Sequence, residues 1–478
     1  MSFGQKTANG FAWNLVETVA NYGSLFVIGI ILARLLSPTE FGVIGILTIF
    51  ISVFDSIVDC GFSNALIRKQ KVEDIDYDTI FIFNIGVSIL LYILFFLGAP
   101  FISDFFNDDS LIRYARVLGL VVIINAFSVV QRTILTKAIN FKRQAIVSIV
   151  ATLLGGAVGI TMAFLGYGVW SLVGQSLAKQ GSTTLLFWYN GHWRPRLRFS
   201  YPSFKEMFTF GWKVLTSGMI ATVWAQIYTF VIGKVYSKAT LGLYSRAQQF
   251  VHIFTVNITA MIRKVTYPAL CSVQENEQEL VGVFRRVLKL VALLSWSGLF
   301  VLASIAEPMI LTLLGEKWAG CVPYLQLLCF SGFTYSVNVM NLNMLQVKGR
   351  SDYFLYVEII SKIIGVAPLL IGIIVGIIEM LYCSILVNLV MYIIGAWYCS
   401  RVINYPVKRQ LIDMLPQILI PTVLALASYP VNMLGWNSLI TLFIQIIIAG
   451  ALFFVLSKML AREEYDAMIK VLEKVRRR

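Results

Sequence analysis

The chain has 478 residues, of which 58% are hydrophobic and 13% are charged, and its formal net charge is +14 at pH 7. A water-soluble globule of this length needs more polar surface than this composition supplies, so a soluble protein is excluded and the surrounding solvent is lipid. The basic balance does not indicate a nucleic-acid partner, because the cations lie at the ends of apolar segments rather than in one patch.

Apolar segments long enough to cross about 30 Å of hydrocarbon recur from Phe11 to Leu460. Continuous apolar runs predict helices, because the strands of a membrane barrel would alternate at every second residue. The first run is too long for the core of a cleavable signal, so we expect it to remain as a helix. The sequence thus predicts an all-α polytopic protein with fourteen membrane helices, at residues 11–36, 42–66, 79–103, 111–136, 144–166, 169–190, 211–235, 241–270, 283–305, 321–346, 354–377, 380–402, 411–430 and 437–460.

The distribution of Lys and Arg predicts the orientation of these helices. If the N-terminus is cytoplasmic, 28 cations lie on the cytoplasmic side, six lie on the opposite side, and five lie within spans. Loops that carry an excess of Lys and Arg stay in the cytoplasm. We therefore expect both termini to be cytoplasmic and the number of spans to be even.

The sequence of one corner between two helices occurs twice in the chain in similar form. The stretch IILARLLSPTEFGVIGI at residues 30–46 is similar to the stretch FVIGKVYSKATLGLYSR at residues 230–246. Pro38 cannot continue the preceding helix, and Gly42, which matches Gly242, is expected to start the next one. A tight hairpin repeated by gene duplication is sufficient to explain this similarity, and we assign the corner no role in substrate binding.

The repeat predicts the organisation of the chain. Six crossings separate the two copies, so the halves are expected to be parallel six-helix repeats related by an axis along the membrane normal. The expected parts are an N-terminal lobe at 1–190, a cytoplasmic linker at 191–210, a C-terminal lobe at 211–402, and two appended helices with a basic tail at 403–478.

No loop exceeds about 20 residues, which weighs against an enzyme, because chemistry at a membrane surface usually needs an extramembrane loop with acids or histidines. Asp108 and Asp109 fit a solvated turn, and His192 and His252 fit interfacial or packing roles. No cofactor is expected. The cysteines form no CxxC motif and fit packing roles rather than a metal site; they are Cys60, Cys271, Cys321, Cys329, Cys383 and Cys399.

Ionisable groups inside a membrane are costly and therefore functional candidates. The cations on the predicted helices suit a phosphate or pyrophosphate presented at the cytoplasmic leaflet, with structural ion pairs or snorkelling as the alternative. The predicted substrate-binding set is Arg132, Lys179, Lys213, Arg246, Arg263 and Lys362.

The acidic groups within spans form the predicted ion-coupling set, which is Glu17, Asp55, Asp59 and Glu358. Asp55 and Asp59 share a helix face and repel each other, which suits uptake of a proton or sodium ion; pairing with cations of neighbouring helices is equally open. Glu358 and Lys362 are four residues apart, so we expect them to pair with each other.

Polar amides lie on the same helices. They give a wet face suited to sugar hydroxyls, although hydrogen bonds between helices explain any one of them. This set is Asn14, Asn21, Asn64, Gln131, Gln175, Gln226, Asn257 and Asn338.

Several motifs, including LARLLSPTEFG, GYGVWSLVGQ at 166–175, RPRLRFS, LLGEKW at 313–318 and KGRSDYFLYVEIISK at 348–362, resemble those of polysaccharide and O-antigen flippases. The resemblance covers the first twelve helices. It implies membership of the multidrug, oligosaccharidyl-lipid and polysaccharide exporter superfamily, with fourteen helices in two lobes around a cationic cavity.

The resemblance also implies a function. Such proteins are multi-pass proteins of the bacterial inner membrane, and they move an undecaprenyl-diphosphate-linked oligosaccharide from the cytoplasmic to the periplasmic leaflet by alternating access coupled to a proton or sodium gradient. The implied partners are this lipid-linked oligosaccharide, membrane lipids, the coupling ion and a polysaccharide polymerase, and the implied state is a monomer.

Three alternatives remain at this stage. A multidrug antiporter of the same fold should have a cavity dominated by acids and aromatics, whereas this chain offers at least as many intramembrane cations as acids. A polytopic glycosyltransferase or polymerase needs a sizeable outer loop, and a scaffold without transport has no use for buried charges.

Overall fold

The structure is a computed structural model that describes residues 3–59, 61–191 and 193–476. Helices and short connections account for all of these residues, which confirms the all-α polytopic fold. Eleven helices among the described residues are long and apolar enough to cross a membrane. The predicted spans at 169–190, 241–270 and 321–346 are largely helical without being among these eleven, so the number of crossings stays a prediction.

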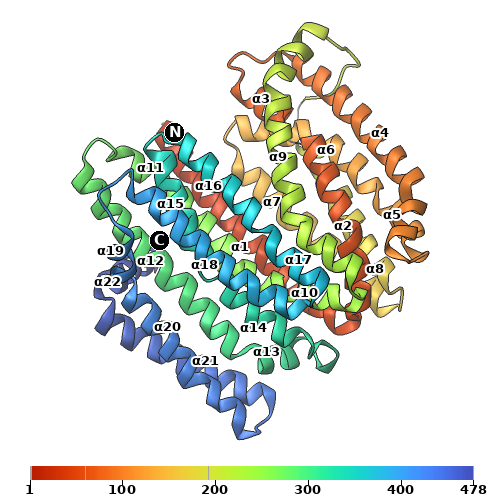
Figure 1. Cartoon of the computed structure of the whole chain (residues 1–478). Helices are drawn as coiled ribbons and strands as arrows, with labels where there is room; N and C mark the ends of the chain where they lie inside the picture. The colour runs from red at the N-terminus through yellow and green to blue at the C-terminus, as the bar shows by residue number, and fades with distance from the viewer. Residues whose placement is uncertain (1–2, 60, 192, 477–478) are drawn as a thin grey trace. The chain divides into compact units, whose positions relative to one another are not determined.

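The chain forms two compact units, residues 1–242 and residues 243–478 (Figure 1). The lobe boundaries that the repeat predicts are not tested by this division and stay a prediction. The helices of unit 1 are α1 (Phe3–Leu35), α2 (Pro38–Asp59), α3 (Phe62–Arg68), α4 (Asp74–Phe106), α5 (Ser110–Leu118), α6 (Leu120–Lys137), α7 (Phe141–Phe164), α8 (Val169–Asn190), α9 (Tyr201–Val235) and the start of α10 (Lys238–His252).

Unit 2 begins within α10 and contains the rest of the chain. Its further helices are the π-helix η1 (Ile253–Asn257), α11 (Ile258–Ser272), α12 (Glu277–Ser304), α13 (Ala306–Leu313), η2 (Glu316–Trp318), α14 (Cys321–Gly332), α15 (Tyr335–Val347), α16 (Ser351–Ile364), α17 (Val366–Ile374), α18 (Ile377–Ser400), α19 (Val407–Asp413), α20 (Leu415–Ser428), η3 (Tyr429–Leu434), α21 (Ser438–Leu460) and α22 (Arg462–Arg476).

Glycines set the close packing of α7 in unit 1. A Cβ on Gly155 would lie 2.6 Å from the Cβ of Lys179, and a Cβ on Gly159 would lie 2.8 Å from that of Gln175, both on α8. Gly156 faces α1, where a Cβ would lie 2.3 Å from a side chain. In lipid, where no hydrophobic force drives helices together, such small residues let backbones approach and pack.

The two copies of the repeated corner touch each other. A Cβ on Gly42 would lie 1.8 Å from the carbonyl oxygen of Lys238, and a Cβ on Gly242 would lie 1.9 Å from that of Pro38. All four residues belong to unit 1. The starts of α2 and α10 therefore meet backbone to backbone in a reciprocal contact that admits only glycine.

Each corner is closed by a serine N-cap. The amide and the hydroxyl of Ser37 both donate to the Glu40 carboxylate, and the Glu40 amide donates weakly to the Ser37 hydroxyl, at 3.4 Å. This is a capping box. In the second copy the Thr240 amide donates to the Ser237 hydroxyl over 3.1 Å. The expectation that Gly42 starts the helix is wrong, since α2 begins at Pro38 directly after its cap.

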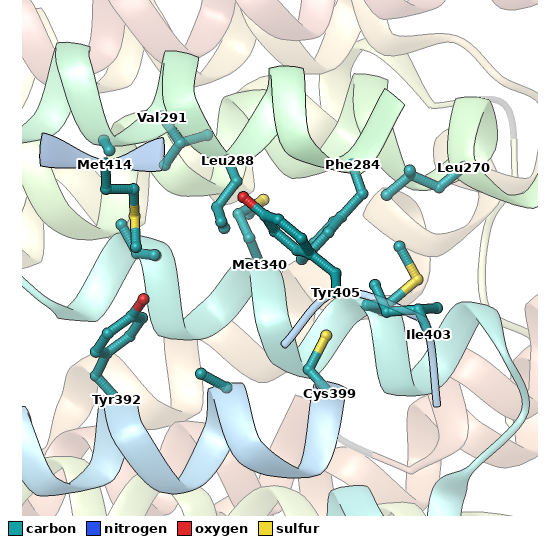
Figure 2. Close-up of a cluster of buried hydrophobic side chains, with 14 of the residues drawn as sticks. Leu270, Phe284, Leu288, Val291, Met340, Tyr392, Cys399, Ile403, Tyr405 and Met414 are labelled. Atoms are coloured by element: carbon teal, nitrogen blue, oxygen red, sulfur yellow. The ribbon is translucent and has the colours of Figure 1, made fainter. Parts of the chain in front are cut away.

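The core of unit 2 surrounds a tyrosine that lies outside the membrane-spanning helices. Figure 2 shows the Tyr405 ring lying among Phe284, Leu288 and Met340, and its side chain is fully buried. The Tyr405 hydroxyl donates to Asp413 Oδ2 over 2.7 Å. Burial and this hydrogen bond to a carboxylate raise the pKa of Tyr405 well above its usual range, so the hydroxyl remains a donor.

A π-helical turn interrupts the segment predicted as the eighth span. The wide turn η1 places the Phe254 ring against Gly298 of α12, where a Cβ would lie 2.2 Å from the ring. Thr255 similarly lies against Gly332 of α14. The extra residue in the turn thus shifts the register between α10 and α11, and two glycines accommodate it.

Candidate functional site

Unit 2 presents a cationic depression on one side of α11. Arg263 and Lys264 are both exposed and line a depression of about 340 Å³ together with Ala260, Tyr267 and Pro268. Arg263 donates to Gln346 Oε1 of α15 over 3.1 Å. Among the described residues no carboxylate forms a salt bridge with Arg263.

Other charged groups lie on the same side of unit 2. The Tyr335 hydroxyl lies within electrostatic range of both Arg263 and Glu358. Lys362 Nζ donates to Glu358 Oε2 over 2.9 Å, which confirms the predicted pairing of these two residues on α16. We call this set the Arg263 face; it consists of Arg263, Lys264, Tyr335, Gln346, Glu358 and Lys362.

The charge of the Arg263 face suits an anion. Its three cations and one carboxylate leave a net charge of about two positive units. A guanidinium group binds phosphate oxygens with two parallel hydrogen bonds, and a lysine contributes a mobile point charge. The face can therefore hold a diphosphate, while the Tyr335 hydroxyl and the Gln346 amide add neutral hydrogen-bonding groups.

Arg246 lies apart from this face, inside unit 2. It is 6% exposed. Its Nη1 atom donates to Gln249 Oε1 over 2.6 Å, and its guanidinium lies 5.7 Å from the ring centre of Trp318. A buried cation held by an amide and an aromatic ring is well suited to packing, so its predicted substrate role stays a prediction.

Unit 1 contains a polar network around one of the predicted ion-coupling acids. Asn125 Nδ2 of α6 donates to Asp55 Oδ1 of α2 over 2.8 Å, and Gln180 Nε2 of α8 donates to Asn125 Oδ1 over 3.0 Å. The Ser128 hydroxyl donates to the Asn125 carbonyl. Three helices thus converge on a carboxylate that lies at membrane depth, and their polar atoms can replace part of the hydration of a proton or cation.

The other predicted site residues of unit 1 belong to different helices. Glu17 on α1, Arg132 on α6 and Lys179 on α8 are half-buried, whereas Lys213 on α9 is exposed. Asp59 belongs to α2, but its side chain lies outside the described residues. Their substrate and ion roles stay predictions.

Hydrogen bonds within unit 1 use several amides of the predicted wet face. Asn21 Oδ1 accepts from the Thr152 hydroxyl, and Gln226 Nε2 donates to the Ser52 hydroxyl. Gln131 Nε2 donates to the Trp193 carbonyl. Asn21 and Gln226 thus form the hydrogen bonds between helices that the alternative predicts, whereas Gln131 bonds to a carbonyl outside the helices.

Four residues at these sites were not predicted from the sequence, namely Asn125, Gln180, Tyr335 and Gln346. Asn125 and Gln180 are polar residues inside apolar spans, so a wider list of intramembrane amides would have included them. Tyr335 and Gln346 carry no comparable signal, because only the packing of α11, α15 and α16 brings them beside Arg263.

Comparison with known families gives a match over residues 31–323 to the family described as "Polysaccharide biosynthesis protein". This range is more than half of the chain. The chain belongs to this family. Membership confirms the resemblance to polysaccharide exporters that the sequence motifs indicate.

This polysaccharide biosynthesis protein has several curated relatives. It is 25% identical to the lipopolysaccharide biosynthesis protein WzxC of Escherichia coli, with 78% of this chain and 76% of WzxC aligned. It is 27% identical to the teichuronic acid biosynthesis protein TuaB of Bacillus subtilis, with 64% of each chain aligned. It is 24% identical to the succinoglycan biosynthesis transport protein ExoT of Rhizobium meliloti, with 67% and 65% aligned.

Solved structures confirm the fold of this family member. The lipid II flippase MurJ in an inward closed conformation aligns with a TM-score of 0.70 at 14% identity, over 94% of this chain and 99% of MurJ. An inward-facing multidrug resistance MATE family transporter of the MOP superfamily aligns with a TM-score of 0.63 at 18% identity, over 81% and 94%. The chain is therefore a multi-pass membrane protein with the fold of this superfamily.

Proposed function

We propose that this protein is a flippase that moves an undecaprenyl-diphosphate-linked oligosaccharide from the cytoplasmic to the periplasmic leaflet of a bacterial inner membrane. It works by alternating access, is coupled to a proton or sodium gradient and has both termini in the cytoplasm. It is a transporter and not an enzyme. It acts as a monomer and passes its cargo to a polysaccharide polymerase.

The Arg263 face is the observation that carries this proposal. A diphosphate holds about two negative charges, and leaving them unpaired away from water costs several kcal/mol. The net charge of the face matches this cargo. Arg263 is directed to a neutral amide rather than to a carboxylate, so its charge is available to a ligand.

The names of the relatives support the same class of cargo. WzxC and TuaB are named for the biosynthesis of cell-surface polysaccharides, and ExoT is named as a transport protein for one of them. A polysaccharide that is assembled on a lipid carrier must cross the membrane as an amphiphile. A chain of apolar helices with short loops suits that transfer better than it suits glycosyl chemistry.

The Asp55 network supports ion coupling. A carboxylate inside a membrane is retained at a cost, and here Asn125 and Gln180 organise its surroundings. Binding of a proton or sodium ion at Asp55 neutralises the carboxylate, which favours a different packing of α2, α6 and α8. Such a change in packing is what couples an ion gradient to alternating access.

Removal of the gene tests the function directly. The lipid-linked oligosaccharide should then accumulate in the cytoplasmic leaflet, as shown by its protection from an impermeant glycosidase added to intact spheroplasts. The wild-type gene should restore accessibility. If the intermediate stays accessible without the gene, flipping is wrong. If the gene instead raises tolerance to cationic drugs, the antiporter alternative holds.

A further inference from the structure

The segment between α8 and α9 follows a fixed path across the end of unit 1. In this segment, residues 193–200 form no helix. The Arg196 amide donates to Asp78 Oδ1 over 3.0 Å, and Gln131 Nε2 donates to the Trp193 carbonyl over 3.0 Å. Asp78 and Gln131 are both buried. The segment is therefore a docked strap, which we define as residues 193–200.

Further contacts hold both ends of the strap. The Ser200 amide donates to the Thr79 hydroxyl over 3.0 Å at the start of α9. The Trp193 ring packs edge-on against Phe81 with ring centres 5.6 Å apart, and Tyr77 packs against the same indole at 6.0 Å. Because α4 supplies most of these partners, the strap is held as one piece with the start of that helix.

The outer side of the docked strap is basic and apolar at once. Arg194, Arg196 and Arg198 are exposed, and no carboxylate in the described part of the chain forms a salt bridge with any of them. Leu197, between two of these arginines, is 90% exposed, and Phe199 is half exposed. Three cations and two apolar side chains are therefore exposed within six residues, and the Arg194 guanidinium also donates to the carbonyls of Gly191 and Trp193.

Large exposed tyrosines flank the strap. Tyr189 near the end of α8 is 87% exposed, and Tyr201 at the start of α9 is 65% exposed. Tyrosine side chains are enriched where membrane helices pass through the head-group layer. Their position indicates that the strap lies at that level, where an exposed leucine can enter the acyl boundary while arginines reach phosphates.

We propose that the strap binds the head groups of anionic phospholipids in the adjacent leaflet. Exposed apolar side chains interleaved with cations at the ends of membrane helices fit a lipid surface better than an acidic protein, which would leave Leu197 and the two tyrosines in water. Each cation near an anionic surface adds to the attraction, and the attraction falls within a Debye length. The strap thereby ties the start of α4 and the start of α9 to the bilayer surface. This anchor does not depend on the proposed cargo.

Hydrogen exchange in nanodiscs tests the proposal on the full chain. Backbone amides of residues 194–199 should exchange at least threefold more slowly in nanodiscs with 30% phosphatidylglycerol than in pure phosphatidylcholine. Raising the salt to 0.5 M should remove the difference. The triple change Arg194→Gln, Arg196→Gln and Arg198→Gln should also abolish it while leaving exchange in pure phosphatidylcholine unchanged.

A matched variant controls for the loss of charge alone. The changes Arg401→Gln, Lys408→Gln and Arg409→Gln remove three exposed cations in and beside α19, and they should leave the lipid-dependent protection of the strap intact. Equal exchange in the two lipids for the wild type, or protection that survives the triple strap variant, would overturn the proposal. A defect of the strap variant in cells without any change in lipid-dependent exchange would point to a protein partner and also overturn it.

Discussion

The reciprocal glycine contact at the repeated corner predicts a large effect from a single methyl group. In the variant Gly42→Ala the new Cβ would lie 1.8 Å from the Lys238 carbonyl oxygen, whereas ordinary contact begins at 3.4 Å. The starts of α2 and α10 would have to separate by about 1.6 Å. Both partners are backbone atoms, so no side-chain rotation relieves the clash.

The cost follows from two opposing effects. Overpacking of a filled site costs about 1–3 kcal/mol, and the absence of a movable side chain puts this site at the upper end. Alanine gains about 1 kcal/mol over glycine inside a helix. The net loss for Gly42→Ala is therefore about 2 kcal/mol. Gly86 in α4 of the same unit has nothing within 4 Å of its Cβ position, so Gly86→Ala should gain up to about 1 kcal/mol.

These variants can be compared by the temperature at which half of the folded protein remains. This temperature is measured by heating each variant in detergent and then running size-exclusion chromatography with fluorescence detection. On the scale of about 2–4 °C per kcal/mol for a unit of this size, Gly42→Ala should melt about 6–12 °C below Gly86→Ala. If the two variants have the same midpoint, the backbone contact does not limit the packing of the corner.

The double variant gives a second test of the same geometry. Once Gly42→Ala has separated the two helix starts, the Cβ of Gly242→Ala enters space that is already open. The double variant should therefore cost much less than the sum of the single variants, with a coupling of at least about 1 kcal/mol. Additive losses would show that the two glycines do not share one contact.

Three more predictions concern the charged groups. Arg263→Ala should reduce glycan export about 10–100-fold at unchanged abundance and Arg263→Lys should retain part of it, because a charged hydrogen bond contributes about 1.5–3 kcal/mol; normal export by the alanine variant would exclude a role in capture. Glu358 and Lys362 are both partly exposed, so a double-mutant cycle on thermal midpoints should give a coupling below about 1 kcal/mol, and a larger value would contradict their exposure. Asp108 contacts Lys238 at 2.5 Å. Burial raises the pKa of Asp108, but the contacts from Lys238 and Ser110 and the charge of Lys238 outweigh this effect and hold the pKa below its usual value. This stabilisation is lost only as pH falls through that lowered pKa, so Asp108→Asn should lower the midpoint equally at pH 5.5 and pH 8, and a difference between the two would refute the assignment.

Periodicity and spacing were enough to predict what depends on one helix at a time. Apolar runs of membrane length predicted the helical polytopic fold, because lipid leaves the backbone no other hydrogen-bonding partner. The four-residue spacing of Glu358 and Lys362 predicted their ion pair, since one turn of a helix fixes that neighbourhood.

Contacts between helices were beyond this reasoning. The hydrogen bonds that join Asp55, Asn125 and Gln180 depend on the rotation of three helices about their axes, which apolar periodicity hardly restricts when most faces are apolar. The same holds for Arg263 and Tyr335. Residue types could therefore be proposed for a site, but the groups that surround each charge required the packing.

The repeated corner shows how the two levels join. Positions 42 and 242 are both glycine because each packs against the backbone of the other copy. A side chain at either position would push the starts of α2 and α10 apart. Position 40 and its counterpart 240 differ because their neighbours differ. Glu40 caps its own helix and also lies beside Gly168, where a Cβ would come within 2.6 Å of its carboxylate, whereas Thr240 in the second copy bonds only within its own turn among the contacts that the structure records. The identity of Gly42 and Gly242 thus follows from their reciprocal contact, whereas the identity of Ser37 and Ser237 follows from the cap that each serine gives its own helix.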